Sequence, residues 1–115
     1  MSSVGYGARG ANQHRKPVDL TIASGETSIS TKSNRPKYRL YAAGTRNIAT
    51  INCTNAGDGY ELVLFVKSGS ANITLVETDN IVVNSTSLVL GANDSVTLMY
   101  DKPNAKWVAI GNYNV

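Results

Sequence analysis

Hydrophobic and polar residues alternate with a period of two along most of the chain after residue 17. Short runs of this kind, divided by Gly, Asn, Asp and Ser roughly every 8–12 residues, are typical of β-strands, and no stretch has a helical period. The predicted strands cover residues 18–23, 27–30, 38–42, 48–53, 60–67, 72–76, 81–83, 87–90, 96–100 and 106–110. The pattern therefore predicts an all-β fold, either an antiparallel β-sandwich or a jelly-roll-like barrel.

The strand at residues 60–67 is the most apolar of these, and a Gly-Asp-Gly turn precedes it. Glycine and aspartate suit a tight turn, because glycine accepts a positive φ and aspartate bonds its own backbone. Val63 and Phe65 occupy the face where a half-solvated strand would carry polar residues. We expect that face to be covered by an opposing sheet or by a neighbouring subunit. Trp107 is likewise expected in the core or at a subunit interface, because its large area favours burial.

Residues 1–17 lack this alternation and differ in composition. They are predicted to form an extended arm that precedes a β-domain of residues 18–115. Three glycines within residues 5–10 disfavour both helix and strand. Val4 and Tyr6 are the residues that could anchor such an arm on a partner by apolar contact.

The net charge of +3 is unevenly distributed. The arm carries only basic charges, at Arg9, Arg15 and Lys16. The other 98 residues hold eight basic and eight acidic side chains, and five of the basic ones fall within 32–46, where there is no acid. A neutral body with a basic arm and a basic segment suits attachment to an acidic surface. Nucleic acid is not indicated, because aromatic and basic residues are not interleaved.

Few residues in the chain are suited to catalysis or metal binding. There is one histidine, His14, and one cysteine, Cys53, so neither a nucleophile–base pair nor a zinc site is expected. Cys53 is expected to be a reduced, buried residue, with an interchain disulfide as the alternative. The aspartates in predicted turns, which should bond their own backbone rather than calcium, are Asp58, Asp79, Asp94 and Asp101. We therefore expect no enzyme, no cofactor and no metal.

No apolar run approaches the roughly 18 residues that a membrane span requires. The first residues contain no apolar stretch of the kind found in secretory signals. The expectation is synthesis in the cytoplasm without a signal peptide and no association with a membrane.

Residues 50–112 contain an Ile-Asn turn, a Gly-x-Gly before an apolar strand, a Gly-x-x-Asp turn before the sequence SVTLMYD, and a final Trp strand. This arrangement resembles a small β-module found at the ends of bacteriophage tail fibres and other virion appendages. The residues that carry the resemblance are Ile51, Asn52, Gly57, Gly59, Leu62, Leu64, Asn80, Ile81, Leu88, Leu90, Asp94, Val96, Leu98, Tyr100, Asp101 and Trp107. The resemblance implies a structural or adhesive role, commonly in symmetric oligomers, with no chemistry attached.

Tail fibres carry this module behind a long shaft, whereas an arm and a few strands precede it here. The sequence thus favours a capsid decoration (cement) protein, which docks on the phage head as a homo-oligomer, expected to be a trimer, and stabilises the head. The arm would contact the major capsid protein, and Val63, Phe65 and Trp107 would build the core and subunit contacts. The alternative is a fibre knob that binds host surface glycan. The aromatic candidates for that role are Tyr38, Tyr41, Tyr60 and Tyr113.

Overall fold

The computed structural model describes residues 16–113 of the 115-residue chain. Eleven strands and one 3-10 turn occur in that range, which confirms the all-β prediction. They are β1 (Val18–Thr21), β2 (Ser28–Lys32), β3 (Lys37–Tyr41), β4 (Arg46–Ile48), β5 (Thr50–Thr54), β6 (Glu61–Val66), β7 (Ile73–Val76), β8 (Ile81–Val82), β9 (Ser87–Leu90), β10 (Ser95–Asp101), η1 (Lys102–Asn104) and β11 (Lys106–Tyr113).

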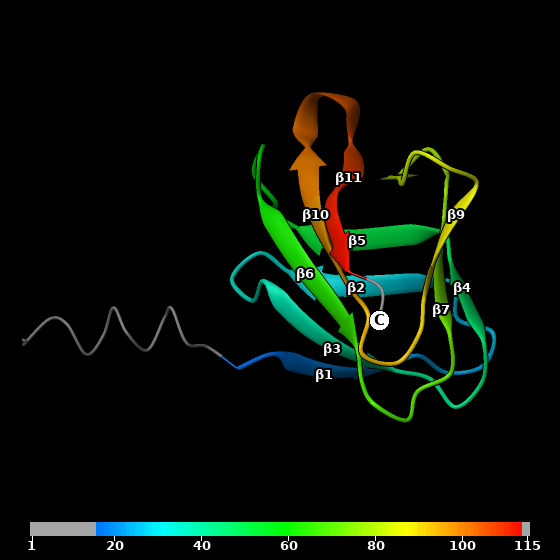
Figure 1. Ribbon diagram of the computed structural model, residues 1–115. Coiled ribbons are helices and arrows are strands. Elements are labelled where there is room, and N and C mark those ends of the chain that lie inside the picture. Colours follow the sequence, from blue (N-terminus) through cyan, green and yellow to red (C-terminus); the bar gives the residue numbers. More distant parts are fainter. Residues whose placement is uncertain (1–15, 114–115) are drawn as a thin grey trace, which may run out of the picture.

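The strands form three sheets that enclose one core from three sides (Figure 1). The largest, sheet A, has six strands in the order β1-β3-β6-β10-β11-β8. Sheet B pairs β2 with β5, and sheet C has the order β4-β7-β9. The molecule is therefore a short three-sided prism rather than two sheets packed face to face.

The first part of the chain winds around this prism, and successive turns stack in parallel. Val18 of β1 pairs with Tyr38 of β3, 20 residues later, and Arg46 of β4 pairs with Ile73 of β7, 27 residues later. β2 pairs in the same way with β5, and β3 with β6. A parallel pair needs a long connection between its strands. Here strands of the other sheets supply that connection: β2 of sheet B lies between β1 and β3, and one strand from each of the other two sheets lies between the members of the other three pairs.

After β8 the chain reverses direction. β9 pairs antiparallel with β7, β10 pairs antiparallel with β6, and β11 returns antiparallel to β10. These strands cover the backbone edges of β6 and β7, whereas the edge of β5 that faces away from β2 pairs with no described strand. Stacked-coil proteins need such a cap at their ends.

Within this all-β fold, the predicted antiparallel pairing is wrong for most of the described strand pairs. Five of the pairings among the described strands are parallel and three are antiparallel. Alternation of side chains tells which residues face the core, but it is the same for a strand that runs in either direction. Among the described strands, every connection between successive strands except that between β10 and β11 is a corner between two sheets.

One apolar cluster fills the prism, and each sheet contributes its inward residues. The central strand β6 inserts Leu62, Leu64 and Val66, all fully buried, as the alternation predicted. Trp107, which is 1% exposed, closes one end of this core. Trp107 thus lies in the core rather than on the surface.

Candidate interaction surfaces

The outer face of sheet A carries Val63 and Phe65. Both are half-buried within the chain, and sheets B and C pack on the opposite face of β6. The expected opposing sheet over Val63 and Phe65 is therefore wrong. A neighbouring subunit is the remaining cover for these two side chains, and that part stays a prediction.

Further apolar side chains extend this face across the sheet. The register sets Val63 beside Thr97 of β10, and Met99 beside Val108 of β11. A bulge in the β10–β11 ladder follows Thr97, and Ile110 next to it is 50% exposed. We call this set the apolar band: Val63, Phe65, Met99, Val108 and Ile110.

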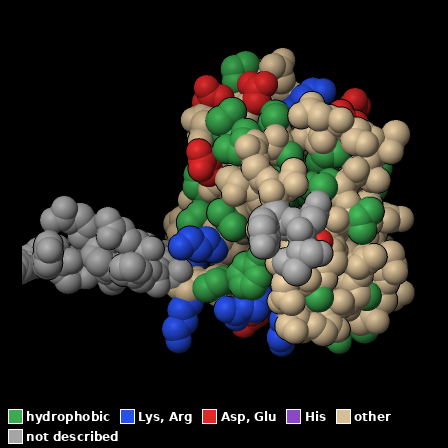
Figure 2. Space-filling view, in the orientation of Figure 1, with side chains coloured by type: hydrophobic (Ala, Val, Ile, Leu, Met, Phe, Trp, Pro, Cys, Tyr) green, Lys and Arg blue, Asp and Glu red, His purple; other side chains and the backbone are tan. Residues whose placement is uncertain are grey.

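Basic side chains lie at one end of the band. Arg39 lies over the Phe65 ring, 5.4 Å from its centroid, and also pairs with Asp19 at 2.8 Å. Lys67 lies 5.7 Å from the centroid of the Tyr41 ring. Lys37, Arg39 and Lys67 are called the basic end below. Figure 2 shows a group of Lys and Arg side chains near β1 and β3, and most of the visible Asp and Glu side chains at the opposite end, where a further basic side chain also lies.

A hollow of about 200 Å³ opens beside the basic end, between β1, β3 and β6. Asp19, Thr21, Arg39, Tyr41 and Lys67 line it. Both side chains of the Arg39–Asp19 pair line the hollow and are exposed to water, so the pair contributes little to stability.

Most of the predicted arm contacts, namely Val4, Tyr6, Arg9 and Arg15, lie outside the described residues. Lys16 is described and exposed, and its backbone carbonyl accepts a hydrogen bond from Arg35 at 3.3 Å. β1 begins at Val18, the first residue of the predicted β-domain.

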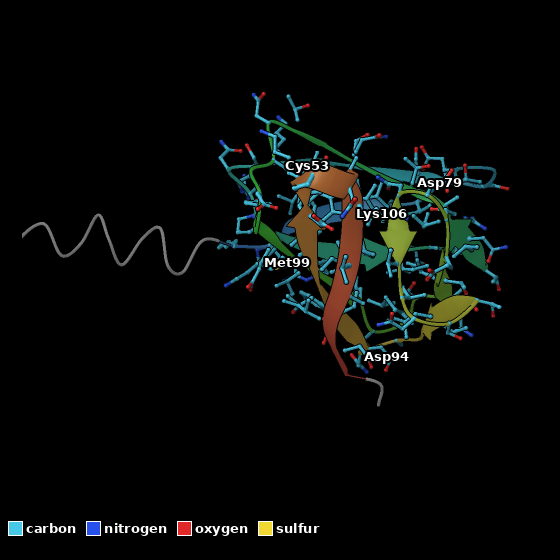
Figure 3. All side chains as sticks on the ribbon, turned by 90° about the horizontal axis from the view of Figure 1, so that it is seen from above. Cys53, Asp79, Asp94, Met99 and Lys106 are labelled. Atoms are coloured by element: carbon cyan, nitrogen blue, oxygen red, sulfur yellow. The ribbon has the colours of Figure 1, made fainter. Side chains whose placement is uncertain are left out.

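A second feature is a cleft between β5 and the β10–β11 hairpin. Its volume is about 350 Å³, and none of its eight lining residues is charged. We call it the polar cleft, lined by Ile51, Asn52, Cys53, Thr54, Asn80, Tyr100, Ala105 and Trp107. Figure 3 shows Cys53 beside the hairpin that closes the cleft.

Asn80 fixes the back wall of the polar cleft. Its Oδ1 accepts the Ile51 N–H at 2.6 Å, and its backbone carbonyl accepts the Trp107 N–H at 2.7 Å. Thr78 supports the same loop, because its hydroxyl donates to the Ala49 carbonyl at 2.8 Å. One residue therefore joins β5 to β11 at the back of the cleft.

Two aromatic rings, Tyr100 and Trp107, line this cleft, and a third, Tyr60, packs against Trp107. Tyr100 lies 4.8 Å from Trp107 between ring centroids, and Tyr60 contacts Trp107 edge-on at 6.4 Å. Burial raises the pKa of the Tyr60 hydroxyl above its ordinary value of 10.0, with smaller contributions from Cys53 and Tyr38. Tyr60 therefore remains neutral at physiological pH.

The turn aspartates behave as predicted only in part: Asp94 bonds the backbone of its own turn, whereas Asp58 bonds the backbone of a residue 44 positions away and Asp101 accepts from the Asn104 side chain at 2.8 Å. Asp58 accepts the Lys102 N–H at 3.0 Å, and Asp94 accepts the Gly91 N–H at 2.7 Å. Asp79 and Asp94 lie well apart in Figure 3, and no cluster of metal-binding side chains occurs among residues 16–113. Cys53 is a free, half-buried thiol, less buried than expected.

Compared with known proteins, the chain matches no family model and no curated sequence. Among residues 16–113, no helix has the length and apolar character needed to cross a membrane.

Sequence reasoning missed the polar cleft and misjudged one of its glycan candidates. Tyr38 is 3% exposed and its hydroxyl accepts the Lys32 N–H at 2.8 Å, so it belongs to the core. The sequence pattern identified Asn80 only as a turn residue and Tyr100 only as a strand residue. The cleft joins segments about 50 residues apart, and alternation within each segment holds no information about that contact.

Proposed function

We propose that the chain is a virion structural protein: a capsid decoration protein that docks on a phage head as a symmetric oligomer and stabilises it. The observation that carries this proposal is the outer face of sheet A, where an apolar band runs directly into a basic end. Contiguous apolar surface rimmed by charge is typical of protein–protein contact sites.

The two parts of this face fit different tasks. Val63, Phe65 and Ile110 offer apolar area for a second copy of the chain, since apolar area drives subunit association. The basic end supplies positive charge that is suited to an acidic shell. An oligomer engages several such contacts at once and so binds far more tightly than a single copy.

Phe65→Asp tests the proposal. The new carboxylate would lie beside Arg39 at the sheet surface, so the monomer should stay folded by circular dichroism. At a subunit contact, however, a buried charge costs several kcal/mol. We expect loss of the oligomer in light scattering and loss of binding to heads from a virus that lacks this gene.

Val89→Asp is the matched control, because Val89 is 48% exposed on β9 in sheet C, away from the apolar band. It should oligomerise and bind heads like the parent protein. The proposal fails if the Phe65 variant still decorates heads with the affinity of the parent, or if the parent protein itself binds no heads.

A further inference from the structure

The polar cleft has the features of a ligand site, and nothing in the assembly role requires it. Its volume of about 350 Å³ falls within the range of about 300–1,000 Å³ common for small-molecule sites. It opens on the inner side of sheet A, where Tyr100 and Trp107 point, whereas the apolar band lies on the outer side.

Several of the groups that line the cleft are polar, uncharged and available for hydrogen bonds to a ligand. Asn52 and Thr54 are exposed on β5, and within residues 16–113 their side chains have no hydrogen-bond partner. Asn80 is held by its Oδ1, so its Nδ2 stays available as a donor. The Tyr100 hydroxyl adds a group that both donates and accepts.

The exposed edge of β5 adds backbone groups to the same wall. Thr31 of β2 donates to the Asn52 carbonyl at 3.1 Å, whereas the Ile51 N–H points away from β2 to Asn80. Because a parallel ladder alternates sides, the Cys53 N–H and C=O also point away from β2, toward the cleft. Asn80 occupies the next position on this edge, which leaves too few groups for an added peptide strand.

We propose that the polar cleft binds an uncharged saccharide. Saccharide hydroxyls both donate and accept, which matches the mixture of amide, hydroxyl and backbone groups on the walls. Tyr100, packed against Trp107, supplies an aromatic surface for the apolar side of a sugar ring. The absence of charged lining residues argues against phosphorylated or strongly acidic ligands.

Ligand binding to the cleft can be followed in the unmodified chain, because Trp107 is its one tryptophan and Cys53 its one cysteine, and both line the cleft. We would titrate the full chain with maltotriose, lactose and triacetylchitotriose, and with a heparin disaccharide as the acidic probe. Trp107 fluorescence should change saturably with at least one neutral saccharide. The same saccharide should slow alkylation of Cys53 by iodoacetamide.

The double variant Asn52→Ala/Thr54→Ala removes two side-chain hydrogen-bonding groups from the rim without breaking a hydrogen bond among residues 16–113. It should weaken binding about tenfold or more, which corresponds to about 1.4 kcal/mol. The matched control is Asn47→Ala/Thr86→Ala, at exposed positions on other surfaces, and should bind like the parent.

Three results would overturn the proposal: no response to any neutral saccharide at millimolar concentrations, equal affinity of the rim variant, or tighter binding of the heparin disaccharide. None of them would bear on head decoration, because the apolar band lies on the other side of sheet A.

Discussion

Gly59 is a residue whose identity is set by the backbone alone. It has φ of +84°, in the left-handed region, and a Cβ added there would meet no atom within 4 Å. Gly57, two residues earlier in the same turn, is equally open but has no positive φ. Neither site is sterically crowded, so a comparison of alanine substitutions at the two glycines isolates the effect of backbone strain.

Gly59→Ala should lower the free energy of unfolding by about 1 kcal/mol or more, because alanine is strained at positive φ. Gly57→Ala should be neutral or stabilising by up to about 1 kcal/mol, since it reduces the entropy of the unfolded chain. Urea denaturation of both variants measures the difference. Equal effects of the two substitutions would contradict this account of the turn.

Residue-level properties were largely predictable from the sequence. The alternation in β6 placed Leu62 and Leu64 in the core and Val63 and Phe65 on the other face, because the direction of a side chain in a strand depends only on its position. The burial of Trp107 followed from its size. The burial of Tyr38 did not, because its hydroxyl partner, the Lys32 N–H, lies at the end of β2 in another sheet, and the sequence does not specify that β2 packs beside Tyr38.

At the level of elements, Asn80 is the clearest link between strands of different sheets. Asn80→Ala would leave the Ile51 N–H without an acceptor while keeping the backbone bond to Trp107. We expect a loss of about 1–3 kcal/mol in the free energy of unfolding, measured by urea denaturation.

Asn80→Asp serves as the control, because it preserves the side-chain oxygen that accepts the Ile51 N–H. It should retain most of the stability that the alanine variant loses. If both variants were as stable as the parent, the Asn80 side chain would not be holding β5 in place.

The strands themselves were predicted well, but their directions and corners were not. The predicted strand 48–53 is in fact β4 and β5, which meet at Ala49. Ile48 and Ile51 are both buried, although a single straight strand would send them to opposite faces. The chain turns from sheet C to sheet B between them. Two buried residues three apart were the signal of this corner.

At the level of the whole molecule, the uneven placement of charge predicts how the protein would meet a shell. Lys37→Glu/Lys67→Glu reverses two charges at the basic end, whereas Lys102→Glu/Lys106→Glu reverses two at the β10–β11 hairpin. On the proposed function, the first pair should weaken head binding at low salt by about tenfold or more, and the second should have little effect.

Co-sedimentation with heads at rising salt concentration measures this difference. The difference in head binding between the two variants should narrow as salt increases. Charge–charge interactions extend over about 10 Å at 0.1 M salt but only about 3 Å at 1 M. Equal losses for the two charge reversals would show that the basic end has no special role in docking.

The winding of the chain also makes the molecule extensible. Each added turn of 20–27 residues would lengthen the prism by one strand spacing, about 4.8 Å, and would leave the reversed strands β9–β11 untouched at their end. The same cap could therefore terminate a short plug or a long rod. In such a design the number of turns would set the length of the molecule, and the surfaces that bind partners would not change with it.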